Sequence, residues 1–103
     1  MDGMPRLSNR LTALTLRSLP PGKHPDGAGL YLIKPDIETG RWMLRYRQFG
    51  RRRDMGLGGW PRVGLGDARR AAEAARRLVD DGLDPISSRR LKTQASQHLL
   101  RHI

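Results

Sequence analysis

Apolar and polar side chains alternate most regularly in the middle of the chain. Residues 41–48, "RWMLRYRQ", place Trp, Leu and Tyr at every second position, which is the period of a half-buried β-strand. The run 51–57, "RRRDMGL", follows after only Phe49 and Gly50, so the two runs predict an antiparallel hairpin with a two-residue turn. The earlier run 29–34, "GLYLIK", is rich in β-formers and predicts a first strand.

The period changes to that of a helix after residue 64. Small and aliphatic side chains recur every three or four positions from Leu65 to Val79, and most of the positions between them carry charge. Asp67 suits the positive end of a helix dipole, and Gly82 suits a left-handed stop after the last turn. Residues 65–79 are therefore predicted to form an amphipathic helix.

Together these elements predict an α+β fold, with a three-stranded antiparallel sheet packed on one C-terminal α-helix. The spacing of the leucines in 11–19 is compatible with a short N-terminal helix, which the double proline at 20–21 would end. We expect a flexible N-terminus over 1–10 and a folded domain over 11–86. Residues 87–103 are expected to be a linker or the start of a following domain.

The predicted hairpin divides its side chains between two faces, because a turn at Phe49 and Gly50 sets the register of both strands. One face collects the apolar side chains that we expect to pack on the helix, namely Trp42, Leu44, Tyr46, Met55 and Leu57. The other face collects Arg41, Met43, Arg45, Arg47, Arg52 and Asp54. Arg47 then lies directly opposite Arg52, a like-charge pair that destabilises a sheet unless a polyanion binds there.

Positive charge dominates the composition. The chain has 20 Lys and Arg residues against 10 Asp and Glu residues, a formal net charge of +10. Such a field attracts nucleic acid, an anionic membrane or an acidic protein. Nearly all of these cations are arginine, whose planar fork suits phosphates and guanine edges, and this favours nucleic acid over a membrane. A basic surface that is simply solvated is the alternative that charge alone leaves open.

Several classes of function are excluded by what the composition lacks. With no cysteine and only three histidines, the chain is expected to hold no disulfide, no metal and no cofactor. No apolar run approaches the roughly 20 residues that span a bilayer, and the first ten residues lack the pattern of a signal peptide. We therefore expect a cytoplasmic protein with no membrane partner, no small-molecule substrate and no catalytic Ser, His and Asp arrangement.

Five spaced motifs occur in order between residues 11 and 90. They are Asp26-Gly27 with Gly29-Leu30-Tyr31-Leu32, the strand from Trp42 to Arg47, Leu57-Gly58 with Trp60-Pro61, Leu65 with Ala68-Arg69, and Gly82-Leu83-Asp84-Pro85-Ile86. Through these motifs the chain resembles the N-terminal arm-type DNA-binding domain of P4-like phage and genomic-island tyrosine integrases. The resemblance implies a bacterial, prophage-encoded module whose sheet enters the major groove of arm sites during DNA integration and recombination. It also implies double-stranded DNA as a partner, with other integrase protomers or a directionality factor as further partners.

The chain departs from the family pattern at three places. Gly64 replaces the usual Ser or Thr before the helix, which removes a side-chain N-cap. Phe49 replaces the usual polar residue before the turn glycine. The recombinase domain, with its arginine, His-x-x-Arg motif and nucleophilic tyrosine, is absent, and we interpret the similar spelling at 98–101 as coincidence. The chain is thus expected to be non-catalytic.

The expected DNA contacts are Arg41, Arg45, Arg47, Arg51, Arg52 and Tyr31. The helix arginines, Arg69, Arg70, Arg76 and Arg77, are expected to form a solvated face, with at most a supporting phosphate contact. Two other functions stay open at this point. A basic sheet could dock an acidic partner of the recombination complex, or it could bind RNA by stacking bases on exposed aromatic side chains.

Overall fold

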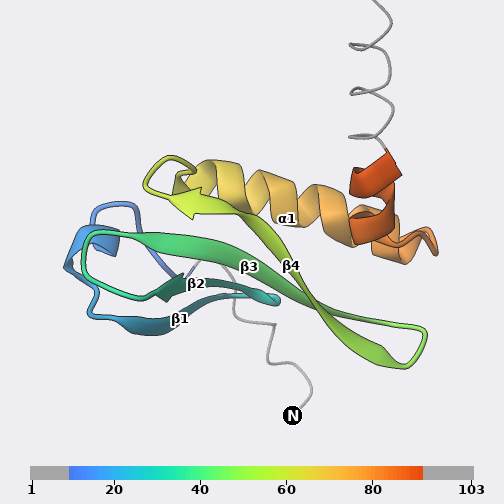
Figure 1. The fold of residues 1–103 in the computed structure, drawn as a ribbon, viewed down its shortest axis with the longest axis horizontal. Helices are drawn as coiled ribbons and strands as arrows, with labels where there is room; N and C mark the ends of the chain where they lie inside the picture. The colour runs from blue at the N-terminus through green and yellow to red at the C-terminus, as the bar shows by residue number, and fades with distance from the viewer. Residues whose placement is uncertain (1–9, 92–103) are drawn as a thin grey trace, which may run out of the picture.

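The antiparallel sheet and the long helix predicted from the sequence both form in the computed structural model, which describes residues 10–91 (Figure 1). The elements are η1 (Leu16–Ser18), β1 (Gly22–Gly27), β2 (Leu30–Lys34), β3 (Gly40–Gln48), β4 (Arg51–Trp60) and α1 (Leu65–Asp80). A further helix begins at residue 85 and includes residue 91, the last one described. The expectations for 1–9 and 92–103, including the His-x-x-Arg spelling, lie outside the described residues.

The sheet has four strands in the order β1-β2-β3-β4, so the prediction of three strands is wrong. The additional strand is β1, "GKHPDG", which shows no apolar alternation and contains a proline, features that normally argue against a strand. β1 lies at the edge of the sheet, where a proline is tolerated, and a register irregularity between Pro25 and Gly27 interrupts its pairing with β2. β1 nevertheless pairs with β2 from Gly22–Lys34 to Gly27–Leu30.

The hairpin of β3 and β4 has the predicted turn. Phe49 and Gly50 have φ values of 52° and 74°, and a type I′ turn needs positive φ at both positions. The predicted pairs from Gln48–Arg51 to Leu44–Met55 are all present. Beyond them the turn-based register predicts Trp42 opposite Leu57, but a bulge in β4 places Trp42 opposite Gly58 instead.

The core lies between the sheet and α1, as expected. Trp42 and Leu44 are completely buried, and the Trp42 indole N–H donates a hydrogen bond to the Val63 carbonyl at 2.8 Å. On the helix, the buried side chains are Leu65, Ala68, Ala72 and Ala75. Because alanine is small, the helix axis can lie close to the sheet, and Figure 1 shows α1 crossing one face of it.

A buried lysine holds the N-terminal turn against this core. The Lys34 side chain is almost fully buried, and its Nζ donates hydrogen bonds of 2.8 Å to the carbonyls of Leu16 and Leu19. The same ammonium lies 4.8 Å from the centre of the Trp60 ring. The short N-terminal helix expected from the sequence is thus a single 3₁₀ turn, η1, anchored to the end of β2.

Helix α1 ends in a Schellman motif. Gly82 has a φ of 80° and donates its N–H to the Val79 carbonyl at 3.0 Å, while Leu83 donates to Leu78 at 2.8 Å. At the other end Gly64 makes no side-chain capping bond, which confirms the missing N-cap. The left-handed stop predicted at Gly82 is also confirmed.

The helix that begins at residue 85 goes beyond the predicted single C-terminal helix. Asp84 accepts a hydrogen bond from the Ile86 N–H at 3.1 Å, and Pro85 occupies the first helical position, a combination typical of a helix start. Asp84 also accepts hydrogen bonds from the Tyr46 hydroxyl at 2.9 Å and from Arg53 at 2.7 Å. Burial and the bond to Asp84 raise the pKa of Tyr46 to about 12. The hairpin and the start of this helix therefore share one carboxylate.

A second carboxylate joins α1 to the edge of the sheet. Asp26 is buried and receives a two-pronged contact from Arg69, with bonds of 3.0 and 2.9 Å, plus one from the Leu11 N–H at 2.9 Å. Burial acts to raise the pKa of Asp26, but the hydrogen bonds from Arg69 and Leu11 outweigh it and the pKa is lowered. The expectation that Arg69 belongs to a solvated face is therefore wrong.

Replacing Asp26 tests this carboxylate. At pH 7, Asp26→Asn should lower the free energy of unfolding by about 2 to 4 kcal/mol, because Arg69 loses its buried partner. The pKa of Asp26 is lower in the folded than in the unfolded protein. The stability that ionised Asp26 contributes is therefore present above about pH 4 and is lost as the pH falls through the pKa of the folded state. Urea melts at pH 7 and pH 3 should show the gap between variant and wild type closing. The exposed Asp67→Asn is the control, and equal stability of Asp26→Asn and wild type at pH 7 would contradict the assignment.

The small side chains of α1 give a second test. Ala72 is completely buried, so Ala72→Leu should push the helix from the sheet and destabilise the fold by about 1 to 3 kcal/mol. Ala74 lies two residues further along and is exposed, so Ala74→Leu should change the stability by less than about 0.5 kcal/mol. Thermal denaturation compares the two. Equal melting temperatures would show that a different side of the helix faces the sheet.

Candidate nucleic-acid interface

The sheet face opposite α1 carries most of the predicted DNA contacts. We call it the basic face, and the register of the four strands assigns to it Lys23, Tyr31, Ile33, Arg41, Met43, Arg45, Arg47, Arg52 and Asp54. Five of the six predicted contacts, all except Arg51, are brought together here. The same strands send their intervening side chains into the core, so the face is backed by a packed layer.

Arg51 is the predicted contact that the structure places elsewhere. It pairs with Gln48, whose side-chain amide donates to the Leu83 carbonyl at 2.7 Å on the α1 side of the sheet. Arg51 therefore projects from the end of the hairpin on the side opposite the basic face. A DNA contact by Arg51 stays a prediction, and its position supports it less than those of the four arginines on the basic face.

The predicted like-charge pair of the basic face is present. Arg47 and Arg52 are cross-strand partners, and both side chains are exposed. Within the described residues 10–91, no acidic side chain forms an ion pair with Arg47, Arg52 or Arg41. Within this part of the chain, the two ends of the face therefore carry arginines that are free of ion pairs.

The centre of the basic face is organised differently. Arg45 donates from Nε to Asp54 at 3.0 Å and from Nη2 to the Tyr31 hydroxyl at 3.4 Å. The bond from Arg45 lowers the pKa of Asp54, which keeps this carboxylate ionised beside the guanidinium. The Tyr31 ring is buried, with Lys23 Nζ 4.3 Å and the Arg45 guanidinium 5.4 Å from its centre. Tyr31 thus supports two cations and offers little free ring surface.

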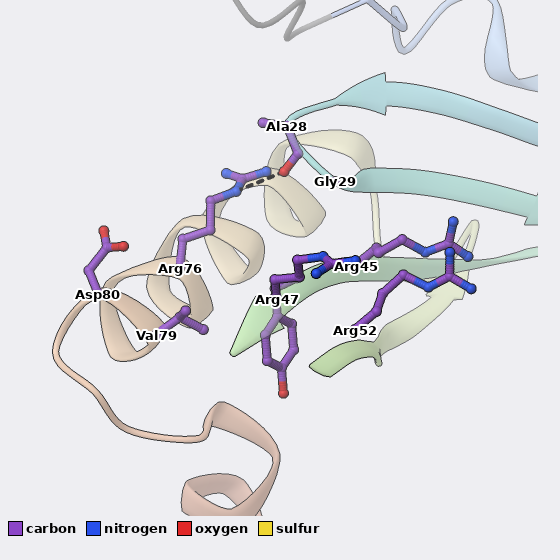
Figure 2. A pocket seen from close by; sticks show the side chains of 9 residues that line it. Ala28, Gly29, Arg45, Arg47, Arg52, Arg76, Val79 and Asp80 are labelled. Carbon is purple, nitrogen blue, oxygen red and sulfur yellow. Dashed lines mark hydrogen bonds between the residues drawn. The ribbon is translucent and has the colours of Figure 1, made fainter. Parts of the chain in front are cut away.

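An open groove of about 710 Å³ lies where β3 extends beyond the end of β2. Figure 2 shows Arg45 and Arg47 of β3 and Arg52 of β4 near it, and Arg76 of α1 on its other side. Arg76 donates from Nε to the Ala28 carbonyl at 3.1 Å. The expectation that Arg76 is merely solvated is therefore wrong. The position of Arg76 in the helical pattern could not predict this bond. The acceptor, Ala28, lies in the turn after β1, and the sequence pattern did not predict that strand.

The described residues offer no sign of two other kinds of site. Among residues 10–91 no three His, Cys, Asp or Glu side chains lie close enough to hold a metal ion. In the same range, no helix combines the length and the apolar composition needed to cross a bilayer.

A small α+β domain with a cation-rich sheet face has the features of a nucleic-acid-binding module. Residues 11–92 match the family model described as Arm DNA-binding domain. The match covers most of the chain, and the chain belongs to this family. The resemblance inferred from the five motifs is therefore confirmed. The match describes a DNA-binding domain and not a catalytic one, in agreement with the expectation of a non-catalytic chain.

Individual relatives support the same assignment. The chain is 32% identical over 84 residues to the integrase of Shigella phage Sf6 and equally so to the prophage integrase IntS of Escherichia coli (strain K12). Each alignment covers 78% of this chain and 22% of the relative. The integrase of Enterobacteria phage P4 is 34% identical over 65 residues, covering 61% of this chain and 15% of that protein. The chain thus spans about a fifth of the length of the first two relatives.

Proposed function

We propose that the chain binds double-stranded DNA sequence-specifically at arm-type sites, with the basic face in the major groove. It does so as the non-catalytic module of a prophage-encoded integrase that acts in site-specific integration and recombination in the bacterial cytoplasm. The observation that carries the proposal is the exposed Arg47–Arg52 pair, neither member of which forms an ion pair with a carboxylate among the described residues. A polyanion that lies along the face relieves this repulsion.

The shape of the hairpin supports the major groove as the binding site. A two-stranded β-ribbon fits the major groove, where arginine forks can meet guanine O6 and N7 or the flanking phosphates. Figure 1 shows the hairpin of β3 and β4 reaching beyond the ends of β1 and β2. The ribbon that carries Arg47 and Arg52 is thus the most prominent part of the sheet.

Neither alternative function has comparable support. RNA binding by stacking needs several exposed aromatic rings, but Tyr31, the aromatic residue of the basic face, is only 6% exposed. Phe49 at the hairpin turn is 82% exposed and is the single exposed aromatic ring among residues 10–91. An acidic protein partner, such as a directionality factor or another integrase protomer, would be attracted by the same charge. Such a partner is compatible with DNA binding, and a titration against duplex, single strand and acidic protein separates the three.

The charge of the basic face predicts a steep dependence of DNA affinity on salt. If about five phosphates are neutralised, the logarithm of the binding constant for duplex DNA should fall with a slope of roughly −4 to −5 against the logarithm of salt concentration. Fluorescence anisotropy with a labelled duplex at several salt concentrations measures this slope. A slope near zero would rule out phosphate neutralisation as the basis of binding.

The like-charge pair predicts opposite effects on folding and binding. Arg47→Ala or Arg52→Ala should leave the free energy of unfolding unchanged or raise it by up to about 1 kcal/mol, because a repulsion is removed. Each change should weaken duplex binding by about 1 to 3 kcal/mol through the loss of a charge-assisted contact. Thermal melts and DNA titrations of the same preparations give both quantities.

The matched control is Arg77→Ala, which removes one positive charge from the exposed side of α1. Arg77 is 78% exposed, and its nearest carboxylate is Glu73 at 3.7 Å. This variant should bind duplex nearly as well as wild type. Arg76→Ala is a poor control because Arg76 bonds the Ala28 carbonyl beside the groove. If Arg77→Ala weakened binding more than Arg47→Ala and Arg52→Ala, the helix and not the hairpin would be the DNA-binding surface.

A further inference from the structure

We propose that Arg45 contacts the edges of the bases, that Arg47 and Arg52 contact phosphates, and that Asp54 is the residue that positions Arg45. This assignment rests on the proposed function and divides the basic face into two kinds of arginine. The division follows from how each guanidinium is held: Arg45 bonds Asp54 and Tyr31, whereas Arg47 and Arg52 form no ion pair among the described residues.

Arg45 is held in one orientation from two neighbouring strands. Asp54 on β4 accepts its Nε–H at 3.0 Å, and the Tyr31 hydroxyl on β2 accepts from Nη2 at 3.4 Å. A guanidinium has five N–H donors, so three remain, all on the terminal nitrogens. A fork fixed from behind, with terminal donors still available, meets the requirement for a bidentate contact to guanine O6 and N7. Less side-chain entropy is then lost on binding.

The charges of Arg45 and Asp54 also support a base contact by Arg45. Arg45 and Asp54 form a neutral pair, so together they add little to the attraction of a polyanion. A carboxylate on a phosphate-binding surface opposes binding, and its presence needs a compensating role. Orienting a base-contacting arginine is such a role, because it raises discrimination between sequences and not the general affinity.

Arg45 also differs from Arg47 and Arg52 in its position along the strands. Arg45 lies on β3, with β4 on one side and, on the other, Gly29 just before β2, whose carbonyl accepts the Arg45 N–H at 2.8 Å. Arg47 and Arg52 lie towards the hairpin end and have no carboxylate partner among the described residues. Arg41 lies six positions before Arg47, about 20 Å along an extended strand, whereas the major groove is about 12 Å wide. The centre of the face thus reaches the groove floor while its ends reach the flanking phosphates.

The test is a selection from a library of duplexes with a randomised central segment, using the full chain. Bound duplexes are sequenced for wild type and for Arg45→Ala, Asp54→Asn, Tyr31→Phe and Arg52→Ala. Circular dichroism melts confirm that each variant is folded. Affinities for a selected duplex and for a scrambled duplex are then measured over a range of salt concentrations.

The base contact predicts a specific pattern. Arg45→Ala should lose the preference at one or two base pairs and bind the selected duplex about 10- to 100-fold more weakly, with the salt slope nearly unchanged. Asp54→Asn should relax the preference at the same base pairs while scrambled duplex binds as well as before or better, because a negative charge is removed. Tyr31→Phe, which removes only the hydroxyl, should weaken the same preference to a smaller degree.

The phosphate contact predicts a different pattern for Arg52→Ala. The selected sequences should stay the same, the affinity for all duplexes should fall together, and the salt slope should become shallower by about 1. The assignment would be overturned if Arg45→Ala or Asp54→Asn kept the wild-type sequence profile, or if Arg52→Ala lost it. Wild-type binding to duplexes without any sequence preference would overturn it too, while leaving duplex binding itself intact. Absence of duplex binding by wild type would instead overturn the proposed function, and this assignment with it.

Discussion

The register between β3 and β4 is the constraint on which the rest of the structure depends. It is set by the turn at Phe49 and Gly50, and it decides which side chains of both strands enter the core. A slip of one residue would place one strand's arginines against α1 and its apolar side chains in solvent. A non-glycine residue in the left-handed region costs about 1 to 2 kcal/mol, and Phe49 accepts this conformation because the packed ladder on either side enforces it.

The arginines outside the basic face show that a net charge of +10 serves two purposes. Arg69 and Arg53 are bound by Asp26 and Asp84, the two carboxylates that connect α1 and the helix at 85–91 to the sheet. These arginines maintain the architecture, so their charge is largely compensated. Part of the charge that forms no ion pair among the described residues lies at the ends of the basic face, on Arg41, Arg47 and Arg52, where a polyanion can bind.

Sequence periodicity could predict the hairpin, its faces, the core Trp42 and helix α1, because each depends on local alternation and on a turn with known geometry. It could not reveal β1, whose sequence GKHPDG pairs with β2 but shows no apolar alternation. Nor could it show the structural roles of Arg69 and Arg76, since their partners lie 43 and 48 residues away along the chain. The helix start at Asp84-Pro85 did have a local sequence signal, a capping residue followed by proline. The apolar periodicity does not detect such a signal.

Whether the basic face is the DNA-binding surface can be tested most directly by nuclear magnetic resonance. A ¹⁵N-labelled chain titrated with duplex DNA should show its largest chemical-shift changes at the backbone amides and arginine Nε groups of the basic face. Arg45, Arg47 and Arg52 should be affected, while the outward side of α1, marked by Arg70 and Arg77, should change little. Largest changes at Arg70 and Arg77, with the basic face unaffected, would contradict the central claim.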